Sequence, residues 1–259
     1  MSKIKNIIGA RKAFIPYITA ADPDLATTLA AMKMLADAGA DIIELGIPFT
    51  DPIADGPTIQ KATERALKND FRMPDMFDVV RQFRASHATP VLLMTYANPV
   101  FSMGYDKFCA GAAAAGVNAV LITDLPPEEA CAFRGAAHEN NLGTVFLCSP
   151  TTTPERLKLI DQAATEFVYY IAHAGVTGVR TDLPTDVAEK LQKLKSQLQN
   201  KLCVGFGVST PEQARALSAH ADGVIVGSAV VKLFEKYQCD ELLVQLKSFT
   251  QKMAEAVHA

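Results

Sequence analysis

Short apolar runs alternate with longer amphipathic stretches along the whole chain. The runs are rich in residues that favour buried strands. The expected strands are Phe14–Thr19, Asp41–Leu45, Pro90–Thr95, Ala119–Thr123, Thr144–Leu147, Phe167–Ile171, Leu202–Phe206 and Gly223–Val226. The stretches between them repeat apolar residues with the 3.6-residue period of a helix. The expected helices are Leu25–Ala38, Thr58–Leu67, Met73–Ala85, Asp106–Ala115, Pro127–Asn140, Pro154–Ala163, Pro184–Gln199, Pro211–Ala219 and Ala229–Val257.

This alternation predicts the α/β class. Strands that are each followed by a helix need right-handed crossovers, and such crossovers make a parallel sheet. With eight such units, a closed (β/α)8 TIM barrel is the most economical architecture. We expect one domain over residues 1–259, with a short helical extension at the N-terminus. The alternative is an open doubly wound sheet, but the first strand is followed by Ala20-Ala21-Asp22-Pro23-Asp24 rather than by a glycine-rich phosphate motif.

Composition removes several classes of function. The net charge is −3 and lysine and arginine form no cluster, which argues against nucleic acid as a partner. The five cysteines are scattered and typical of reduced residues, and no histidine pattern indicates a metal site. No signal sequence or run long enough to span a membrane is present, so we expect a cytoplasmic protein without a membrane partner.

The loop after the second expected strand carries the strongest candidate chemistry. Glu44 lies at the end of an apolar run, and Asp51 and Asp55 follow in a loop that three prolines stiffen. A carboxylate at the end of a buried strand costs free energy unless a partner compensates it or a raised pKa is useful. The alternative is a buried acid that pairs with a nearby lysine or arginine.

Active sites of such barrels lie at the carboxyl ends of the strands. Tyr96 and Asn98 follow the third strand, Asp124 follows the fourth, and Tyr169 belongs to the sixth. Tyr169 could equally pack in the core, and Asp124 could equally cap a helix.

Glycines after the last three strands indicate a phosphate site. Gly207 follows the seventh strand, and Gly227 with Ser228 opens a helix after the eighth. Amide groups at a helix N-terminus bind anions, and glycine lets the anion approach closely. Gly178 could add a donor from the loop 175–184, which has the composition of a mobile lid. The alternatives are tight turns and an ordinary surface loop.

Six motifs in order carry a family likeness. They are Phe14-Ile-Pro-Tyr-Ile-Thr19, Glu44-Leu-Gly-Ile-Pro-Phe-Thr-Asp-Pro-Ile-Ala-Asp-Gly-Pro57, Tyr96-Ala-Asn98, Gly175-Val-Thr-Gly178, Gly205-Phe-Gly207 and Gly227-Ser228. Together they resemble the tryptophan synthase alpha subunit from about Phe14 to the end of the chain. The stretch that begins at Glu44 is highly specific to that family.

The resemblance implies retro-aldol cleavage of indole-3-glycerol phosphate to indole and glyceraldehyde 3-phosphate. It assigns general acid and base to Glu44, whose apolar neighbours should raise its pKa. It assigns the indole N–H to Asp55, an active-site contact to Tyr169 and a lid contact to Thr177. It also implies phosphate contacts at Gly178, Gly207, Gly227 and Ser228, and neither a metal nor a cofactor in this chain.

The resemblance also implies a protein partner, a beta subunit that carries pyridoxal phosphate, in an alpha2-beta2 assembly. The expected interface is formed by Phe49, Asp51, Asn98 and Phe101, because exposed aromatics beside charges can anchor an interface. The alternative is that both rings fold inward and wall the pocket. Two other functions stay open, a sugar-phosphate isomerase or epimerase and a binding subunit that acts mainly on a partner enzyme.

Overall fold

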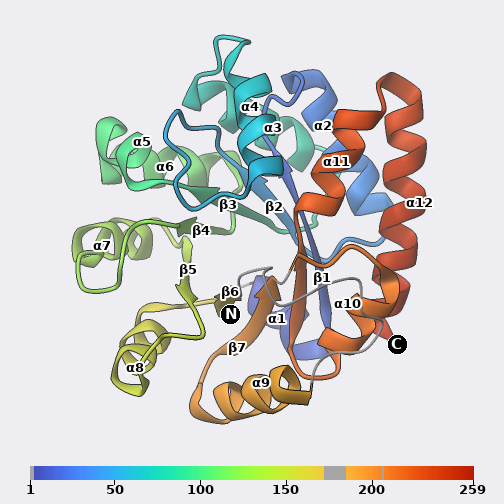
Figure 1. Ribbon diagram of the computed structural model, residues 1–259. Coiled ribbons are helices and arrows are strands. Elements are labelled where there is room, and N and C mark those ends of the chain that lie inside the picture. The colour runs from blue at the N-terminus through green and yellow to red at the C-terminus, as the bar shows by residue number, and fades with distance from the viewer. Residues whose placement is uncertain (1–2, 172–184, 206) are drawn as a thin grey trace.

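The computed structural model describes residues 3–171, 185–205 and 207–259. Eight parallel strands form one closed barrel in the order of the chain, and the first strand pairs with the last (Figure 1). The strands are β1 (Ala13–Thr19), β2 (Ile43–Gly46), β3 (Val91–Thr95), β4 (Ala119–Ile122), β5 (Gly143–Cys148), β6 (Phe167–Ile171), β7 (Lys201–Gly205) and β8 (Gly223–Val226). The predicted TIM barrel is confirmed, and each strand lies within two residues of its predicted start.

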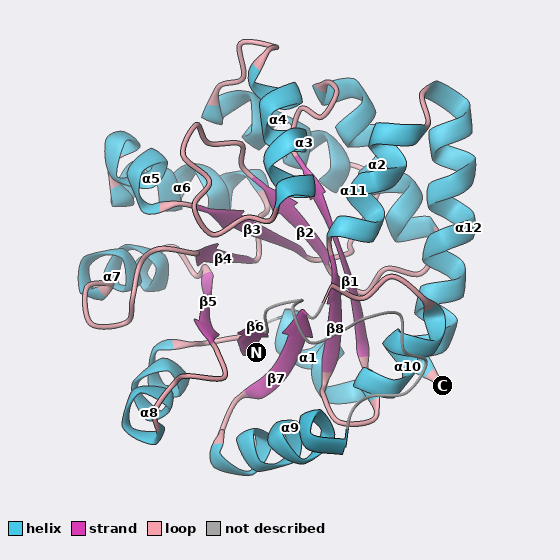
Figure 2. Ribbon diagram, viewed as in Figure 1, coloured by secondary structure: helices cyan, strands magenta, loops and turns pink. Residues whose placement is uncertain are grey.

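Helices surround the barrel on its outer face, except α1, which lies at one end (Figure 2). The helices among the described residues are α1 (Lys3–Ala10), α2 (Leu25–Asp37), α3 (Pro57–Leu67), α4 (Met73–Arg84), α5 (Ala97–Met103), α6 (Tyr105–Ala115), α7 (Cys131–Glu139), α8 (Pro154–Ala163), α9 (Thr185–Gln197), α10 (Pro211–Ser218), α11 (Ser228–Lys236) and α12 (Cys239–His258). No helix in this part of the chain is long and apolar enough to cross a bilayer.

Alternating side chains divide each strand between two cores. Phe14 and Ile18 of β1 belong to the large core under the surrounding helices, whereas Ile15 belongs to the core inside the barrel. Ile4 and Ile8 of α1 join that inner core. Because α1 directly precedes β1, it closes the barrel at the end where the strands begin, and the opposite end stays available for a site.

Two predicted helices differ from the structure, and one helix was not predicted. The stretch 229–257 is two helices, because Tyr237 and Gln238 adopt extended backbone angles between α11 and α12. The predicted helix from Pro127 begins only at Cys131, after a turn. Helix α5 was not predicted, and its first amide, Ala97 N–H, donates to Asp124 Oδ1 at 2.7 Å. Asp124 therefore does satisfy a helix terminus, but that of the preceding βα unit.

Candidate active site

Glu44 lies inside the barrel near the carboxyl end of β2. Its neighbours Ile43 and Leu45 face the outer core, so the alternation of the strand turns Glu44 inward. The side chain is buried, and its Oε1 accepts no hydrogen bond from any residue that the structure describes. Burial, assisted by the negative charge of Asp55, raises the pKa of Glu44 to about 8. Among the described residues no cation perturbs this carboxyl group, which argues against the alternative of a buried ion pair.

Asp55 lies in the loop between β2 and α3, and two hydrogen bonds hold its backbone. Asp55 N–H donates to Pro52 O at 3.1 Å, and Gln60 Nε2 donates to Asp55 O at 2.8 Å. Burial raises the pKa of Asp55 to about 6, and a hydrogen bond from Tyr96 works against that rise. At neutral pH Asp55 is therefore mostly ionised while Glu44 is mostly protonated. Two carboxyl groups with separated pKa values suit distinct acid and charge-stabilising roles.

Both carboxyl groups line one cavity of about 130 Å³. Its walls are otherwise largely apolar, with two tyrosines, and include Tyr17, Ile59, Met94, Leu121, Leu147, Tyr169, Ile225 and Gly227. An apolar enclosure strengthens electrostatic interactions and suits a flat aromatic group. The cavity can therefore hold an aromatic ring beside a proton donor and a carboxylate.

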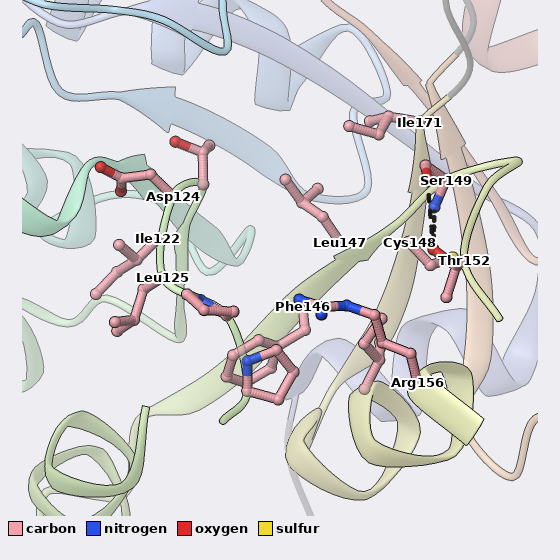
Figure 3. A pocket seen from close by; sticks show the side chains of 14 residues that line it. Ile122, Asp124, Leu125, Phe146, Leu147, Cys148, Ser149, Thr152, Arg156 and Ile171 are labelled. Atoms are coloured by element: carbon pink, nitrogen blue, oxygen red, sulfur yellow. Dashed lines mark hydrogen bonds between the residues drawn. The ribbon is translucent and has the colours of Figure 1, made fainter. Parts of the chain in front are cut away.

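A second cavity of about 290 Å³ adjoins the first and shares Thr123, Leu147 and Ile171 with it. It lies over the ends of β4 and β5, with Asp124 and Arg156 on opposite sides (Figure 3). Neither Glu44 nor Asp55 lines it. The two carboxyl groups with raised pKa values therefore face the smaller cavity.

Of the expected phosphate residues that the structure describes, Gly227 is the one that lines the cavity of Glu44 and Asp55. It directly precedes α11, and within residues 3–171, 185–205 and 207–259 no side-chain cap bonds to the start of that helix. Gly207, after β7, has φ of +67°, a conformation that favours glycine. A helix N-terminus with free amides beside a cavity can bind an anion. Thr177 and Gly178, together with the expected lid 175–184, lie outside the described residues.

Comparison with known proteins decides the family. Residues 4–258 match the family model described as "Tryptophan synthase alpha chain". The chain belongs to the tryptophan synthase alpha chain family. Members of this family are lyases that act on indole-3-glycerol phosphate in tryptophan biosynthesis and carry no cofactor of their own, as the sequence predicted.

Curated relatives and solved structures agree with this assignment. The tryptophan synthase alpha chain of Geobacter sulfurreducens is 45% identical over 96% of this chain and 94% of its own length. The crystal structure of the alpha subunit from Legionella pneumophila superposes with a TM-score of 0.90 at 37% identity, covering 99% of this chain and 98% of the other. A chain of the tryptophan synthase a2b2 complex from Pyrococcus furiosus has a TM-score of 0.88 at 44% identity, covering 94% and 98%.

The residues predicted to bind a partner do not all lie on the surface of this tryptophan synthase alpha chain homologue. Asp51, Asn98 and Phe101 are exposed, and Phe101 is 69% exposed. Phe49 is half-buried, because its ring packs on Tyr96 with 5.4 Å between the ring centroids. The prediction that both aromatics stand in solvent is therefore wrong for Phe49. Sequence reasoning also overlooked Ile53, which is 81% exposed.

The sequence analysis gave no role to Tyr17, which lines the cavity, or to Tyr96, which contacts the Asp55 loop. Tyr17 pairs in register with Glu44 across β1 and β2, and its hydroxyl lies 3.2 Å from Thr19 Oγ1. The alternation of β1 places Tyr17 on the same inner face as Ile15, so the strand pattern contained that signal. Tyr96 was noted only as a residue after the third strand. Its contacts with Asp55 depend on the path of a distant loop, which no local pattern shows.

Proposed function

We propose that this chain cleaves indole-3-glycerol phosphate to indole and glyceraldehyde 3-phosphate by a retro-aldol reaction in which Glu44 moves both protons. The observation that carries this assignment is the buried, unpaired carboxyl of Glu44, whose pKa is raised to about 8 inside the apolar cavity. Membership of the family indicates which reaction is catalysed, and the surroundings of Glu44 support its role in that reaction.

Glu44 begins the reaction as a general acid. Its proton passes to C3 of the indole ring, which gives an indoleninium cation and leaves a buried carboxylate. That carboxylate takes the proton of the side-chain hydroxyl that becomes the aldehyde oxygen. The bond between C3 and the side chain breaks, and its electron pair returns to the ring and neutralises the nitrogen. Glu44 is protonated again at the end, so one residue closes the proton balance.

Asp55 has the complementary role of stabilising charge. Its pKa of about 6 leaves it ionised at neutral pH, and in this role it accepts a hydrogen bond from the indole N–H. Positive charge develops on that nitrogen only as C3 is protonated. The carboxylate therefore stabilises the transition state more than the ground state.

The remaining contacts orient the substrate. We assign the phosphate to the turn at Gly207 and to the start of α11 at Gly227 and Ser228, with Gly178 as a further donor. Tyr169 contacts the substrate from the wall of the cavity, and Thr177 belongs to the lid. The uncapped amides of α11 and the position of Gly227 on the cavity wall support the phosphate assignment.

We also propose that this chain docks on a beta subunit that carries pyridoxal phosphate, in an alpha2-beta2 assembly in the cytoplasm. The related Pyrococcus furiosus chain belongs to an a2b2 complex. The candidate surface combines exposed Asp51, Asn98 and Phe101 with Phe49 as a support beneath it. The five free thiols agree with a reducing compartment.

An assay of purified chain with indole-3-glycerol phosphate, with and without a tryptophan synthase beta subunit, tests the function. We expect slow release of indole by the chain alone and a clear increase with the beta subunit. Isomerisation of a sugar phosphate without indole release would instead support the isomerase alternative. Indole release only in the presence of the beta subunit would support the binding-subunit alternative.

Substitutions on the docking surface are compared with a substitution elsewhere whose side chain is similarly exposed. Phe101→Ala and Asp51→Ala should weaken association with the beta subunit and the activation that it brings, with a smaller effect on the isolated chain. Val244→Ala on α12 is the control, because Val244 is 63% exposed against 69% for Phe101. Undiminished affinity of the Phe101→Ala and Asp51→Ala double variant would place the interface elsewhere.

A further inference from the structure

A buried ion pair joins the end of β1 to α3, the helix that follows the Asp55 loop. Asp22 comes just after β1, and its side chain is 2% exposed. Arg65, in the last turn of α3, donates from Nε to Asp22 Oδ1 at 2.8 Å and from Nη2 to Oδ2 at 2.7 Å. A bidentate pair of this kind fixes the orientation of its partners as well as their distance. The pair therefore holds the C-terminal half of α3 in one place against the end of β1.

The N-terminal half of α3 forms part of the catalytic cavity. Ile59 lines the cavity together with Asp55, which lies two positions before the helix. Gln60 Nε2 donates to the backbone oxygen of Asp55 at 2.8 Å. Because hydrogen bonds between successive turns make a short helix a rigid unit, a shift at Arg65 would also move Ile59 and the backbone of Asp55.

Apolar packing contributes less to the position of α3 than to that of its neighbour α4. The buried residues of α3 are all small: Ala62, Thr63 and Ala66. Those of α4, which has a similar length, are Met76, Phe77, Val79, Val80 and Phe83. Stabilisation grows with the apolar area removed from water, so α3 depends more than α4 on a polar contact.

We propose that Asp22 and Arg65 are a positioning pair for the catalytic cavity: they hold α3 against the end of β1, so that Asp55 stays enclosed. Neither residue of the pair lines the cavity itself. The inference rests on the proposed role of Asp55. Catalysis by a fixed charge requires that the charge is already in place before the transition state forms.

The charges around the pair make Arg65 difficult to replace. Burial raises the pKa of Asp22, and the hydrogen bonds and positive charge of Arg65 oppose that rise. Among the described residues the other charge that acts on Asp22 is the acid Glu235 of α11. No second cation is therefore available to Asp22 there, and a weaker contact with Arg65 leaves a buried carboxylate poorly compensated.

The pKa of Asp55 reports whether α3 is in place. Burial is the main cause of its rise to about 6. A displaced α3 would admit water to the carboxyl group, and the pKa of Asp55 would fall toward the ordinary value of an aspartate. The titratable groups that interact with Asp55 all have pKa values raised above 7, so they do not obscure this titration: Glu44 of β2, Tyr17 of β1, Tyr96 after β3 and Tyr169 of β6.

Arg65→Lys tests the proposal, because it keeps the charge but cannot form two parallel hydrogen bonds. In a 13C NMR titration of the free chain, with Asp55→Asn to assign the signal, the pKa of Asp55 should lie below the wild-type value of about 6. The acid limb of kcat/KM should move to lower pH with it. We expect kcat to fall about tenfold, with a smaller change in KM, because small displacements of a catalytic group are costly.

Arg81→Lys is the matched control. Arg81 pairs with Asp78 on α4, and both side chains are about half exposed. Exposed pairs contribute little, so this variant should leave the pKa of Asp55 and the acid limb at their wild-type values. A folded Arg65→Lys protein in which Asp55 titrates at the wild-type pH would overturn the positioning role.

Two double comparisons complete the test. In an Arg65→Lys background, Asp22→Asn should have little further effect on the pKa of Asp55, because the two residues act as one unit. Equal shifts in both backgrounds would contradict the proposal. The NMR titration does not depend on the reaction, so wild-type kcat of Asp55→Asn would refute the proposed function of Asp55 while the titration still decides the positioning role.

A milder substitution covers the case in which Arg65→Lys does not fold. Asn69 follows α3 at the surface, and its side-chain amide donates to the backbone oxygen of Pro23, next to Asp22. Asn69→Ala weakens the same attachment of α3 without disturbing a buried charge. The pKa of Asp55 should again fall below the wild-type value, and an unchanged pKa would contradict the proposal.

Discussion

Two buried acids, Asp41 just before β2 and Glu44 within it, lie three positions apart and have different surroundings. At the end where the strands begin, Asp41 Oδ2 accepts hydrogen bonds from Phe14 N–H at 2.8 Å and from His258 Nε2 at 2.7 Å, and Arg11 pairs with its other oxygen. At the catalytic end, Glu44 receives no such compensation from the described residues. The first arrangement stabilises a charge, and the second keeps a proton available.

Other carboxylates follow the same division. Asp161 accepts from the backbone amides of Gln199 and Asn200 at 2.8 and 3.0 Å. Asp222 pairs with Lys195 at 2.7 Å and accepts from Leu202 N–H at 3.0 Å. These acids fasten loops that lead into strands, where the barrel holds no site. Position alone does not decide the matter, because Asp22, buried just after β1, is paired with Arg65. Glu44 differs in having a raised pKa and no cationic partner among the described residues.

Glu44→Gln is expected to have the largest effect on activity. It keeps the size of the side chain and removes both proton transfers, so kcat should fall by roughly 10²–10⁴-fold or more while ligand binding is nearly unchanged. Steady-state kinetics and binding of glyceraldehyde 3-phosphate measure the two effects. A variant that retains more than about a tenth of wild-type kcat would exclude the acid–base role.

The stability of the same variant, measured relative to the wild type, should depend on pH. The pKa of Glu44 is raised in the folded state to about 8, so the folded protein binds this proton more tightly than the unfolded chain does. Stability therefore falls as pH rises through the interval between the ordinary glutamate pKa and about 8. Glu44→Gln lacks this dependence, so its stability relative to the wild type should be higher at pH 9 than at pH 5. Urea denaturation at the two pH values measures the difference.

Asp55→Asn should follow in size. The change removes the negative charge and keeps the shape, so kcat should fall more than KM rises, because the charge acts mainly in the transition state. Wild-type kcat/KM should rise with pH through about 6 as Asp55 ionises and fall through about 8 as Glu44 loses its proton. Asp55→Asn should lose the rising limb. An increase in KM with constant kcat would show that Asp55 only binds the substrate.

Asp41→Asn is the matched change at the other end of the strand. It leaves Arg11 and His258 without their charged partner, so the free energy of unfolding should fall by about 1–3 kcal/mol. The kcat of folded Asp41→Asn protein should remain that of the wild type, which is the reverse of the expectation for Glu44→Gln. Denaturation curves and kinetics on the same samples test this contrast. A large loss of kcat with unchanged stability would remove the division between the two ends.

The elements that depend on local sequence were predictable, and those that depend on distant contacts were not. Apolar runs located the eight strands and placed Glu44 at the end of one of them, whereas the sequence left Tyr169 open between the core and the site. The runs could not decide whether Glu44 has a cation partner, because such a partner comes from another element. Helix α5 was missed because it is short and is held at its first amide by Asp124 of the next loop.

Of the other differences between the predicted and the observed structure, the sequence could have revealed some but not all. The break between α11 and α12 could have been found, since Asp240 and Glu241 are acids in a first helical turn. The burial of Phe49 could not, because it depends on Tyr96 after the next strand. The hydrogen bond from Ala54 N–H to the Tyr96 hydroxyl likewise could not, because 42 positions separate the two residues.

The proposed mechanism requires that Glu44 is protonated in the free enzyme at neutral pH. Titration of the side-chain carboxyl carbons by 13C NMR measures this directly, with Glu44→Gln to assign the signal. We predict one glutamate that titrates near pH 8 and is absent from the variant. A Glu44 signal that titrates at the ordinary pKa of glutamate, about 4.3, would contradict the account.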